Sequence, residues 1–255
     1  MPETCVAAQL YTLREFMKTP TDIAANMPRV AALGYRAVQL SALGPIDVSE
    51  LKKICDDAGL TVCATHVSFT RLLQELETVI EEHRTLGCDY LAVGSMPNEF
   101  RSAGGYPRFA REASQIARRL KQAGIRFGYH NHSFELERFG GLSGLEVLYA
   151  ESDPEVFNGE MDTYWLQHGG ADPAAWIRRM AGRVPCVHFK DMAMRDNQQI
   201  MAEVGEGNLN WPAILEACEA AGVEWYIVEQ DHTYGRDPFE SLAISLRNLR
   251  EWGLA

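Results

Sequence analysis

Four segments in the second half of the chain each end in a side chain of a type that binds metal ions. An apolar or aromatic run precedes each of these side chains, which is typical of a buried strand. The four residues are Glu135, Asp162, His188 and Glu229. If the runs are neighbouring parallel strands, their carboxyl ends meet at one mouth and bring three carboxylates and one imidazole together. We therefore expect a divalent cation there, and a cation at an open mouth indicates catalysis.

The four positions differ in how strongly the sequence supports them. Glu229 follows a strand-like apolar run, where a buried carboxylate without a cation costs several kcal/mol. Glu135 has the weakest support, because His130 and His132 share one face of an ideal strand and leave Glu135 on the other. A bulge or the end of the strand would turn Glu135 inward. Glu137 is the alternative acid from the same segment.

The expected donor set of three carboxylates and one imidazole is hard and oxygen-rich. Such a set suits one divalent ion, and we expect Mn²⁺, with Mg²⁺, Co²⁺, Fe²⁺ or Zn²⁺ as alternatives. None of the six cysteines forms a C-x-x-C pair. Reduced, buried thiols are therefore expected in place of a disulfide framework or a thiolate zinc site.

Further polar side chains follow the expected strands and should face the same mouth. We expect the substrate to be bound by Gln9, Tyr11, His66, His130, Trp165, His168 and Lys190. Alternatively, each of them hydrogen-bonds the residues that form the site and does not contact the substrate. Several of these groups together could capture the hydroxyls of a sugar, with Trp165 or Phe134 stacked on its face. His132, together with His66, is the candidate acid for a departing group, whereas His83 lies in a charged helix and is expected on the surface.

One signature positions these residues along the chain. A helical segment ends in a glycine and a short hydrophobic strand follows, at Gly34, Gly59, Gly87, Gly124, Gly182 and Gly222. Glycine just past a helix adopts the left-handed conformation that closes the last turn. Two further segments, the first and the sixth, complete a set of eight expected strands. They cover residues 5–10, 37–40, 61–64, 90–93, 126–129, 156–161, 186–189 and 225–228.

Eight strands that alternate with helices predict an α/β fold with right-handed crossovers and a parallel sheet. In 255 residues, this pattern favours a single (β/α)8 TIM barrel with an eight-stranded parallel core, and one domain over residues 1–255. An open doubly wound sheet is the alternative. It would require a glycine-rich phosphate turn after the first strand, and residues 10–14 contain no glycine.

The bulk composition excludes several classes of partner. A formal net charge of −11 gives no affinity for phosphate backbones, so nucleic-acid binding is not expected. No apolar stretch has the length of a membrane span, and the beginning of the chain has no signal-peptide pattern. We expect a cytoplasmic protein that binds a small molecule. Homo-oligomerisation is left open, because the sequence does not indicate it.

Several segments carry a resemblance to a known family. They are residues 9–14, 129–134 (YHNHSF), 161–165, 182–183, 188–191, 205–208 and 228–231. Together they resemble the sugar phosphate isomerase/epimerase group of xylose isomerase-like TIM barrels, over essentially the whole chain. The resemblance implies a divalent metal held by the acid after the fifth strand, Asp162, His188 and Glu229. It also implies that Glu135 and Glu229 flank the carbon whose proton moves.

The resemblance therefore predicts an enzyme of carbohydrate metabolism, a metal-dependent isomerase or epimerase that abstracts a proton next to a metal-bound carbonyl of a keto-sugar or related polyol. Glu135, Glu229 and His132 are its candidate catalytic residues. The group also includes lyases, so elimination of water or an aglycone from a keto-inositol or 3-keto-glycoside is the alternative. A non-catalytic sugar-binding subunit is the alternative of another class. Whether the substrate carries a phosphate depends on whether Arg14, Arg101 and Arg108 reach the mouth.

Overall fold

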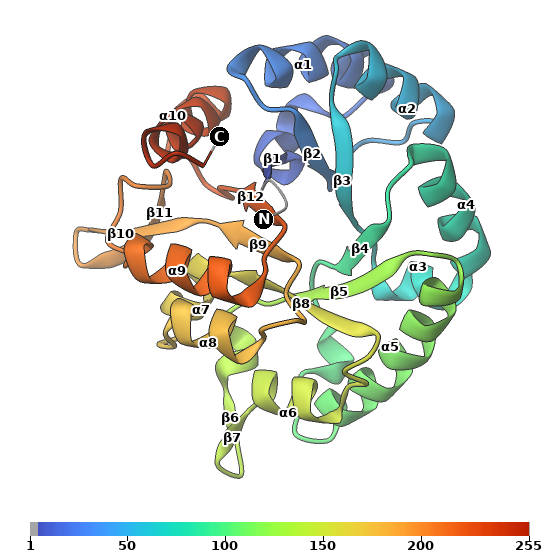
Figure 1. The fold of residues 1–255 in the computed structure, drawn as a ribbon, viewed down its shortest axis with the longest axis vertical. Helices are drawn as coiled ribbons and strands as arrows, with labels where there is room; N and C mark the ends of the chain where they lie inside the picture. Colours follow the sequence, from blue (N-terminus) through green and yellow to red (C-terminus); the bar gives the residue numbers. More distant parts are fainter. Residues whose placement is uncertain (1–4, 255) are drawn as a thin grey trace.

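Eight parallel strands close into a barrel in the computed structural model, which describes residues 5–254 (Figure 1). In spatial order the strands run β1-β12-β9-β8-β5-β4-β3-β2, with β1 paired to both β2 and β12. They are β1 (Cys5–Gln9), β2 (Ala37–Leu40), β3 (Thr61–His66), β4 (Tyr90–Val93), β5 (Arg126–His130), β8 (Phe157–Asp162), β9 (Cys186–Phe189) and β12 (Trp225–Val228). The predicted TIM barrel is confirmed.

Helices surround the barrel on the outside (Figure 1). They are α1 (Pro20–Leu33), α2 (Val48–Asp57), α3 (Phe69–Gln74), α4 (Leu76–Leu86), α5 (Gly105–Gln122), α6 (Gly144–Glu151), α7 (Thr163–His168), α8 (Pro173–Arg179), α9 (Trp211–Ala221) and α10 (Pro238–Glu251). Short 3-10 helices follow three strands: η1 (Leu10–Phe16), η2 (Asn98–Phe100) and η3 (Phe134–Leu136). Two small hairpins extend from the barrel, β6 (Arg138–Phe139) with β7 (Leu142–Ser143), and β10 (Asp191–Arg195) with β11 (Gln198–Ala202).

The predicted glycine turns connect the helices to the strands. All six glycines have a positive φ, between 68° at Gly87 and 111° at Gly34. At Gly222, which ends α9, the backbone N–H donates to carbonyls of the last helical turn. The left-handed conformation there turns the chain directly into β12, which carries a candidate metal ligand at its end.

The interior of the barrel changes from apolar to polar along its axis. Small or apolar side chains form a separate buried cluster inside, made by Ala7, Ala37, Cys63, Ala64, Tyr90, Ala92, Cys186 and Ile227. Because successive side chains of a strand alternate between its faces, residues two positions further along point the same way. Gln9, Gln39, His188 and Glu229 stand two positions after members of this cluster, and all four are buried. The carboxyl ends of the strands therefore carry a buried polar layer.

His83 is buried, contrary to the expectation of a surface position. It lies in α4 with 3% of its surface exposed, and its Nδ1 is 2.7 Å from the carbonyl oxygen of Val79. Its Nε2 is 2.8 Å from the Thr65 hydroxyl on β3. The charged residues around His83 in sequence occupy the outer face of the helix, while His83 faces the barrel. Burial lowers its pKa below the ordinary value of 6.5.

Within residues 5–254, none of the helices has both the length and the apolar character that crossing a bilayer requires.

The burial of His83 predicts a loss of stability in acid. Because its pKa is lowered in the folded state, the unfolded chain binds a proton below pH 6.5 that the folded chain does not bind. The His83 contribution is therefore present above that pH and is lost as the pH falls. Urea unfolding should show that the free energy of unfolding falls more between neutral pH and pH 5 for the native protein than for His83→Gln. Equal losses in the two proteins would contradict this assignment.

Candidate metal centre

Four buried side chains converge at the carboxyl end of the barrel. Donor atoms of His130, Asp162, His188 and Glu229 all lie within 4.8 Å of one another. They come from the last residues of β5 and β8, from β9, and from the position directly after β12. Asp162 and His188 are fully buried, and His130 and Glu229 nearly so. The structure thus brings together three of the four predicted ligands, and His130 takes the fourth place.

Both imidazoles are held by hydrogen bonds on the side that faces away from this centre. His130 Nδ1 lies 3.0 Å from the Gly94 carbonyl oxygen, which can only accept, so its Nε2 is the nitrogen that faces Asp162 Oδ2 at 3.2 Å. His188 Nε2 donates to Gln39 Oε1 at 2.7 Å, while its Nδ1 lies 3.0 Å from Glu229 Oε2. Metal-binding histidines are oriented in the same way, by a partner on the outer nitrogen.

Glu135 has partners of its own and is not in this cluster. It lies in η3, fully buried, where its Oε1 accepts from the Tyr129 hydroxyl at 2.6 Å and its Oε2 from the backbone N–H of His132 at 2.9 Å. Burial raises its pKa to about 7 in spite of these hydrogen bonds. Its carboxylate stabilises the turn that follows β5. Glu135 thus lies outside the four-residue cluster, in which His130, expected from the sequence to bind substrate, stands beside the other three expected ligands.

A lysine ammonium lies directly beside the cluster. Lys190 is fully buried, and its Nζ is 2.8 Å from Glu229 Oε2, 3.0 Å from Asp162 Oδ2 and 3.0 Å from Asp231 Oδ2. Burial opposes each charge, but the charges stabilise one another. They hold the pKa of Lys190 well above its ordinary value and the pKa of Glu229 well below. Lys190, predicted to bind substrate, is therefore part of the charged centre itself.

The balance of charge at this centre fits a divalent cation. Asp162, Glu229, Asp231 and Glu160 supply four negative charges when ionised, and Lys190 and protonated His188 supply two positive charges, which leaves two negative charges unbalanced. Burial, and then the nearby Glu229, raises the pKa of Asp231, as expected for a surplus of negative charge. Two imidazole nitrogens and two carboxylates are also a donor set that Mn²⁺, Fe²⁺, Co²⁺ and Zn²⁺ accept. The residues present thus fit the expected metal.

A second group of side chains lies one step deeper in the barrel. Gln39 Nε2 donates to Glu160 Oε1 at 2.7 Å, and Gln9 Nε2 donates to Gln39 Oε1 at 2.6 Å. His66 Nε2 lies 2.6 Å from the other oxygen of Glu160, which is also 3.3 Å from His188 Nε2. Burial opposes the charge on His188, but Glu160 and Glu229 raise its pKa to about 10, so an ion bound at Nδ1 displaces a proton.

This deeper group contains two residues that the sequence predicts to bind substrate. Gln9 and His66 hydrogen-bond Gln39 and Glu160 in the structure, and through them they contact His188. Sequence reasoning missed Glu160. The available signal was its position two residues before Asp162 on the same strand, which places both side chains on the inner face of the barrel.

An aromatic wall with unpaired polar atoms borders the metal centre. The rings of His132 and Trp165 lie 5.2 Å apart, and Lys190 Nζ lies 5.5 Å from the Trp165 ring. His132 Nδ1 and Trp165 Nε1 are buried and have no hydrogen-bond partner among the described residues. Hydroxyls of a bound sugar would supply such partners. His168, at the end of α7, is exposed, with its ring 5.4 Å from that of Trp165.

His132 does not have the properties of a proton donor. Burial lowers the pKa of His132, and the positive charges of His130 and Lys190 lower it further, to about 2. Its imidazole is therefore neutral near pH 7. The predicted acid role of His132 is therefore not supported by its surroundings, although its position beside Trp165 agrees with a role in the active site.

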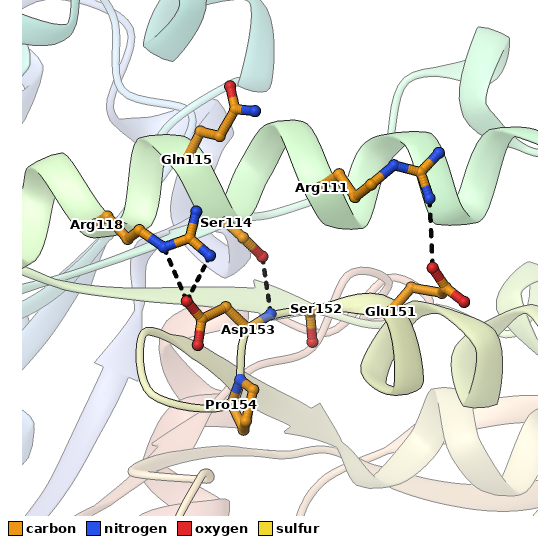
Figure 2. Close-up of a pocket in the computed structure, with 8 residues that line it drawn as sticks. All are labelled: Arg111, Ser114, Gln115, Arg118, Glu151, Ser152, Asp153 and Pro154. Atoms are coloured by element: carbon orange, nitrogen blue, oxygen red, sulfur yellow. Dashed lines mark hydrogen bonds and ion pairs between the residues drawn. The ribbon is translucent and has the colours of Figure 1, made fainter.

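Two hollows lie outside the metal centre. One of about 430 Å³ lies at the rim, lined by Arg14, Asp231 and Tyr234 among others, and Arg14 stacks on Tyr11 at 4.3 Å. The other, of about 410 Å³, lies between α5 and the loop that precedes β8 (Figure 2). Its arginines, Arg111 and Arg118, are paired with Glu151 and Asp153. Because that loop enters β8 at its amino end, the second hollow is remote from the mouth.

The sequence and the fold both match known proteins. A sequence profile described as xylose isomerase-like TIM barrel matches residues 27–252. An inosose dehydratase of Lacticaseibacillus casei is 23% identical over 247 residues, which cover 81% of this chain and 82% of that protein. One from Geobacillus thermodenitrificans is 21% identical, with 87% of each chain covered. A solved structure described as a sugar phosphate isomerase/epimerase from Parabacteroides distasonis has a TM-score of 0.82 at 25% identity, and covers 97% of this chain and 98% of its own.

The geometry makes opposite predictions for His130 and Glu135. In metal-stripped protein titrated with Mn²⁺ by calorimetry, His130→Ala should weaken binding by at least about tenfold. Glu135→Gln should leave the affinity unchanged and lower the free energy of unfolding by about 1–3 kcal/mol, because its single amide oxygen can accept only one of the two hydrogen bonds that the carboxylate accepts. Circular dichroism serves as the control for folding. Weaker binding in Glu135→Gln together with unchanged binding in His130→Ala would restore the ligand set expected from the sequence.

Proposed function

The chain belongs to the xylose isomerase-like TIM barrel family, and on that premise we propose that it is a metal-dependent lyase of polyol ketones. In this proposal it removes the proton next to a carbonyl and eliminates water or an alcohol from the neighbouring carbon. The observation that carries the proposal is the placement of Glu229 and Lys190, a carboxylate and an ammonium 2.8 Å apart, beside the four-residue metal cluster.

The residues of the cluster have separate tasks in this proposal. When bound, a divalent ion polarises the carbonyl and makes the adjacent C–H bond more acidic. Glu229 is ionised, since Lys190 and His188 stabilise its charge against the effect of burial, and it is the carboxylate available to accept the proton. Lys190 Nζ carries protons next to this base and can donate one to the departing oxygen. Trp165 and His132 orient the ring of the substrate through their unpaired nitrogens.

The positions of base and acid favour elimination over epimerisation. Inversion at one carbon requires groups on opposite faces of the substrate, and the resemblance assigned them to Glu135 and Glu229. Glu135 is engaged by Tyr129 and by the backbone of His132 instead. Glu229 and Lys190 lie side by side and so reach the same face. The similarity to inosose dehydratases, noted above, supports the same choice.

Isomerisation is the second candidate function. A single carboxylate on one face, such as Glu229, can return the proton to the neighbouring carbon of the same intermediate without any group on the opposite face. The similarity to the sugar phosphate isomerase/epimerase of Parabacteroides distasonis supports this candidate. Mn²⁺ remains the ion that we propose, because carboxylate and imidazole donors are both present.

The arginine contacts support a substrate without a phosphate group. The two terminal nitrogens of Arg14 donate to the carbonyl oxygens of Tyr11 and Asp231. Arg101 donates to the carbonyl of Met96, and Arg108 lies over the Phe100 ring. Arg14 and Arg101 thus use guanidinium nitrogens within the protein, and Arg108 lies in α5 beside Glu112. A neutral polyol ketone, such as an inosose or a 3-keto-glycoside, agrees best with this arrangement.

The proposal is tested with an inosose and with a 3-keto-glucoside as substrates. The native protein loaded with Mn²⁺ should form the unsaturated elimination product, followed by ultraviolet absorbance and by NMR. Glu229→Gln should lower kcat by roughly 10²–10⁴-fold, since it removes the base. In D₂O, deuterium should enter the carbon next to the carbonyl. Isomerised ketones or aldoses in place of the unsaturated product would favour the second candidate.

Two outcomes would contradict any metal-dependent function. One is full activity in Glu229→Gln. The other is activity that survives exhaustive chelation, with the metal content checked by elemental analysis. A protein that binds the ketone but exchanges no deuterium would instead be a sugar-binding subunit.

A further inference from the structure

Lys190 binds the two carboxylate oxygens that the imidazoles of the four-residue cluster also face. It is the only buried lysine among residues 5–254, and it lies 3.0 Å from Asp162 Oδ2 and 2.8 Å from Glu229 Oε2. His130 Nε2 and His188 Nδ1 face these same oxygens, at 3.2 Å and 3.0 Å. The ammonium thus lies at the point where the four donor side chains of the cluster converge.

One oxygen of Asp162 already has a backbone partner. Its Oδ1 accepts the backbone N–H of Trp165 at 2.8 Å and so caps the first turn of α7. Its Oδ2 faces His130 in the cluster, and Oδ2 is also where Lys190 binds. A divalent ion binds carboxylate oxygens at about 2.0–2.2 Å. At that distance it would be close to a second positive charge in a buried site, where charge repulsion is strong.

The structure also contains a second position for the ammonium. Asp231 Oδ2 lies 3.0 Å from Lys190 Nζ on the side of the rim hollow, and Asp231 is outside the four-residue cluster. Among residues 5–254, no lysine or arginine other than Lys190 pairs with the Asp231 carboxylate. A lysine that leaves Asp162 and Glu229 can therefore remain ion-paired without crossing an apolar region.

We propose that Lys190 is a built-in cation that holds Asp162 and Glu229 together until a divalent ion replaces it, after which it keeps Asp231 as its partner and faces the substrate. This inference rests on the metal-dependent function proposed above. It has two consequences. The metal affinity of the protein is lower than its four donors alone would give. Metal binding also precedes productive substrate binding, because only then is Lys190 free to contact a substrate oxygen.

The alternative is a permanent structural ion pair. In that case Lys190 would stay on Asp162 and Glu229 in every state, and its removal would leave buried carboxylates unpaired and weaken the whole site. The two accounts make opposite predictions for metal affinity when the ammonium is removed, which makes them separable by one substitution.

The test compares Lys190→Met, which keeps the length of the side chain, with Lys18→Met, which removes an exposed lysine paired with Glu15. Both are stripped of metal and titrated with Mn²⁺ by calorimetry. Lys190→Met should bind Mn²⁺ at least about tenfold more tightly than the native protein, and Lys18→Met should not differ from it. Stripped of metal, Lys190→Met should melt at a lower temperature than the stripped native protein. Added Mn²⁺ should raise its melting temperature by more. Unchanged or weaker binding by folded Lys190→Met would overturn the proposal.

Asp231→Asn supplies a second arm, which is measured first with Lys190 in place and then in the Lys190→Met background. Removing the second position of the ammonium should weaken Mn²⁺ binding when Lys190 is present. In the Lys190→Met background most of this effect should disappear, because no ammonium remains to be moved. If Asp231→Asn weakens Mn²⁺ binding equally in both backgrounds, the cause is the loss of one negative charge, and the proposal is overturned. It is also overturned if Asp231→Asn leaves Mn²⁺ binding unchanged in both backgrounds.

The outcomes separate this inference from the proposed function. If the native protein binds Mn²⁺ and turns over the ketone while Lys190→Met binds no more tightly, only the role of Lys190 fails. If the native protein binds no divalent ion at all, both the metal-dependent function and the role of Lys190 fail.

Discussion

The site depends on one electrostatic constraint: two buried carboxylates and a third, half-buried one surround a single ammonium. Asp162, Glu229 and Asp231 all contact Lys190 at 2.8–3.0 Å inside the mouth of the barrel. Buried charges are tolerated only when they are paired, and here the pairing is incomplete by two charges. This deficit explains why a divalent cation fits the centre, whereas Lys190 and His188 keep the carboxylate of Glu229 ionised. In our proposal, Lys190 competes with the divalent ion for these carboxylates and contacts the substrate once the ion has bound.

The barrel creates this constraint by simple geometry. Side chains two positions apart on a strand point to the same face, so Glu160 and Asp162 both enter the interior, as do His188 and Lys190. The lower pair, Glu160 and His188, is connected to Gln39 and fixes which nitrogen of His188 faces the ion. The residues deeper in the barrel are hydrogen-bonded to one another. The excess negative charge therefore lies at the mouth, on Asp162, Glu229 and Asp231.

The sequence predicted the strands almost to the residue, because each apolar run is bounded by a helix-ending glycine and a polar terminus. It also predicted Asp162, His188 and Glu229, which stand at or directly beside strand ends. Glu135 lies outside the cluster because β5 ends at His130 and a 3-10 turn follows, and its metal role stays a prediction. The reach of Lys190 across to Asp162 and Asp231 depends on side-chain packing between three strands, which local sequence patterns do not encode. The structure and the family match agree on the fold, while the choice between elimination and isomerisation depends on how these few side chains meet the substrate.

The central claim is that a single divalent ion joins His130, Asp162, His188 and Glu229. The most direct measurement is a crystal structure of the Mn²⁺-loaded protein with data collected for anomalous scattering. The account predicts one strong anomalous peak within bonding distance of all four side chains, with Lys190 Nζ on Asp231 and no longer on Asp162. A peak at Glu135, or no peak at the mouth in fully loaded crystals, would contradict it.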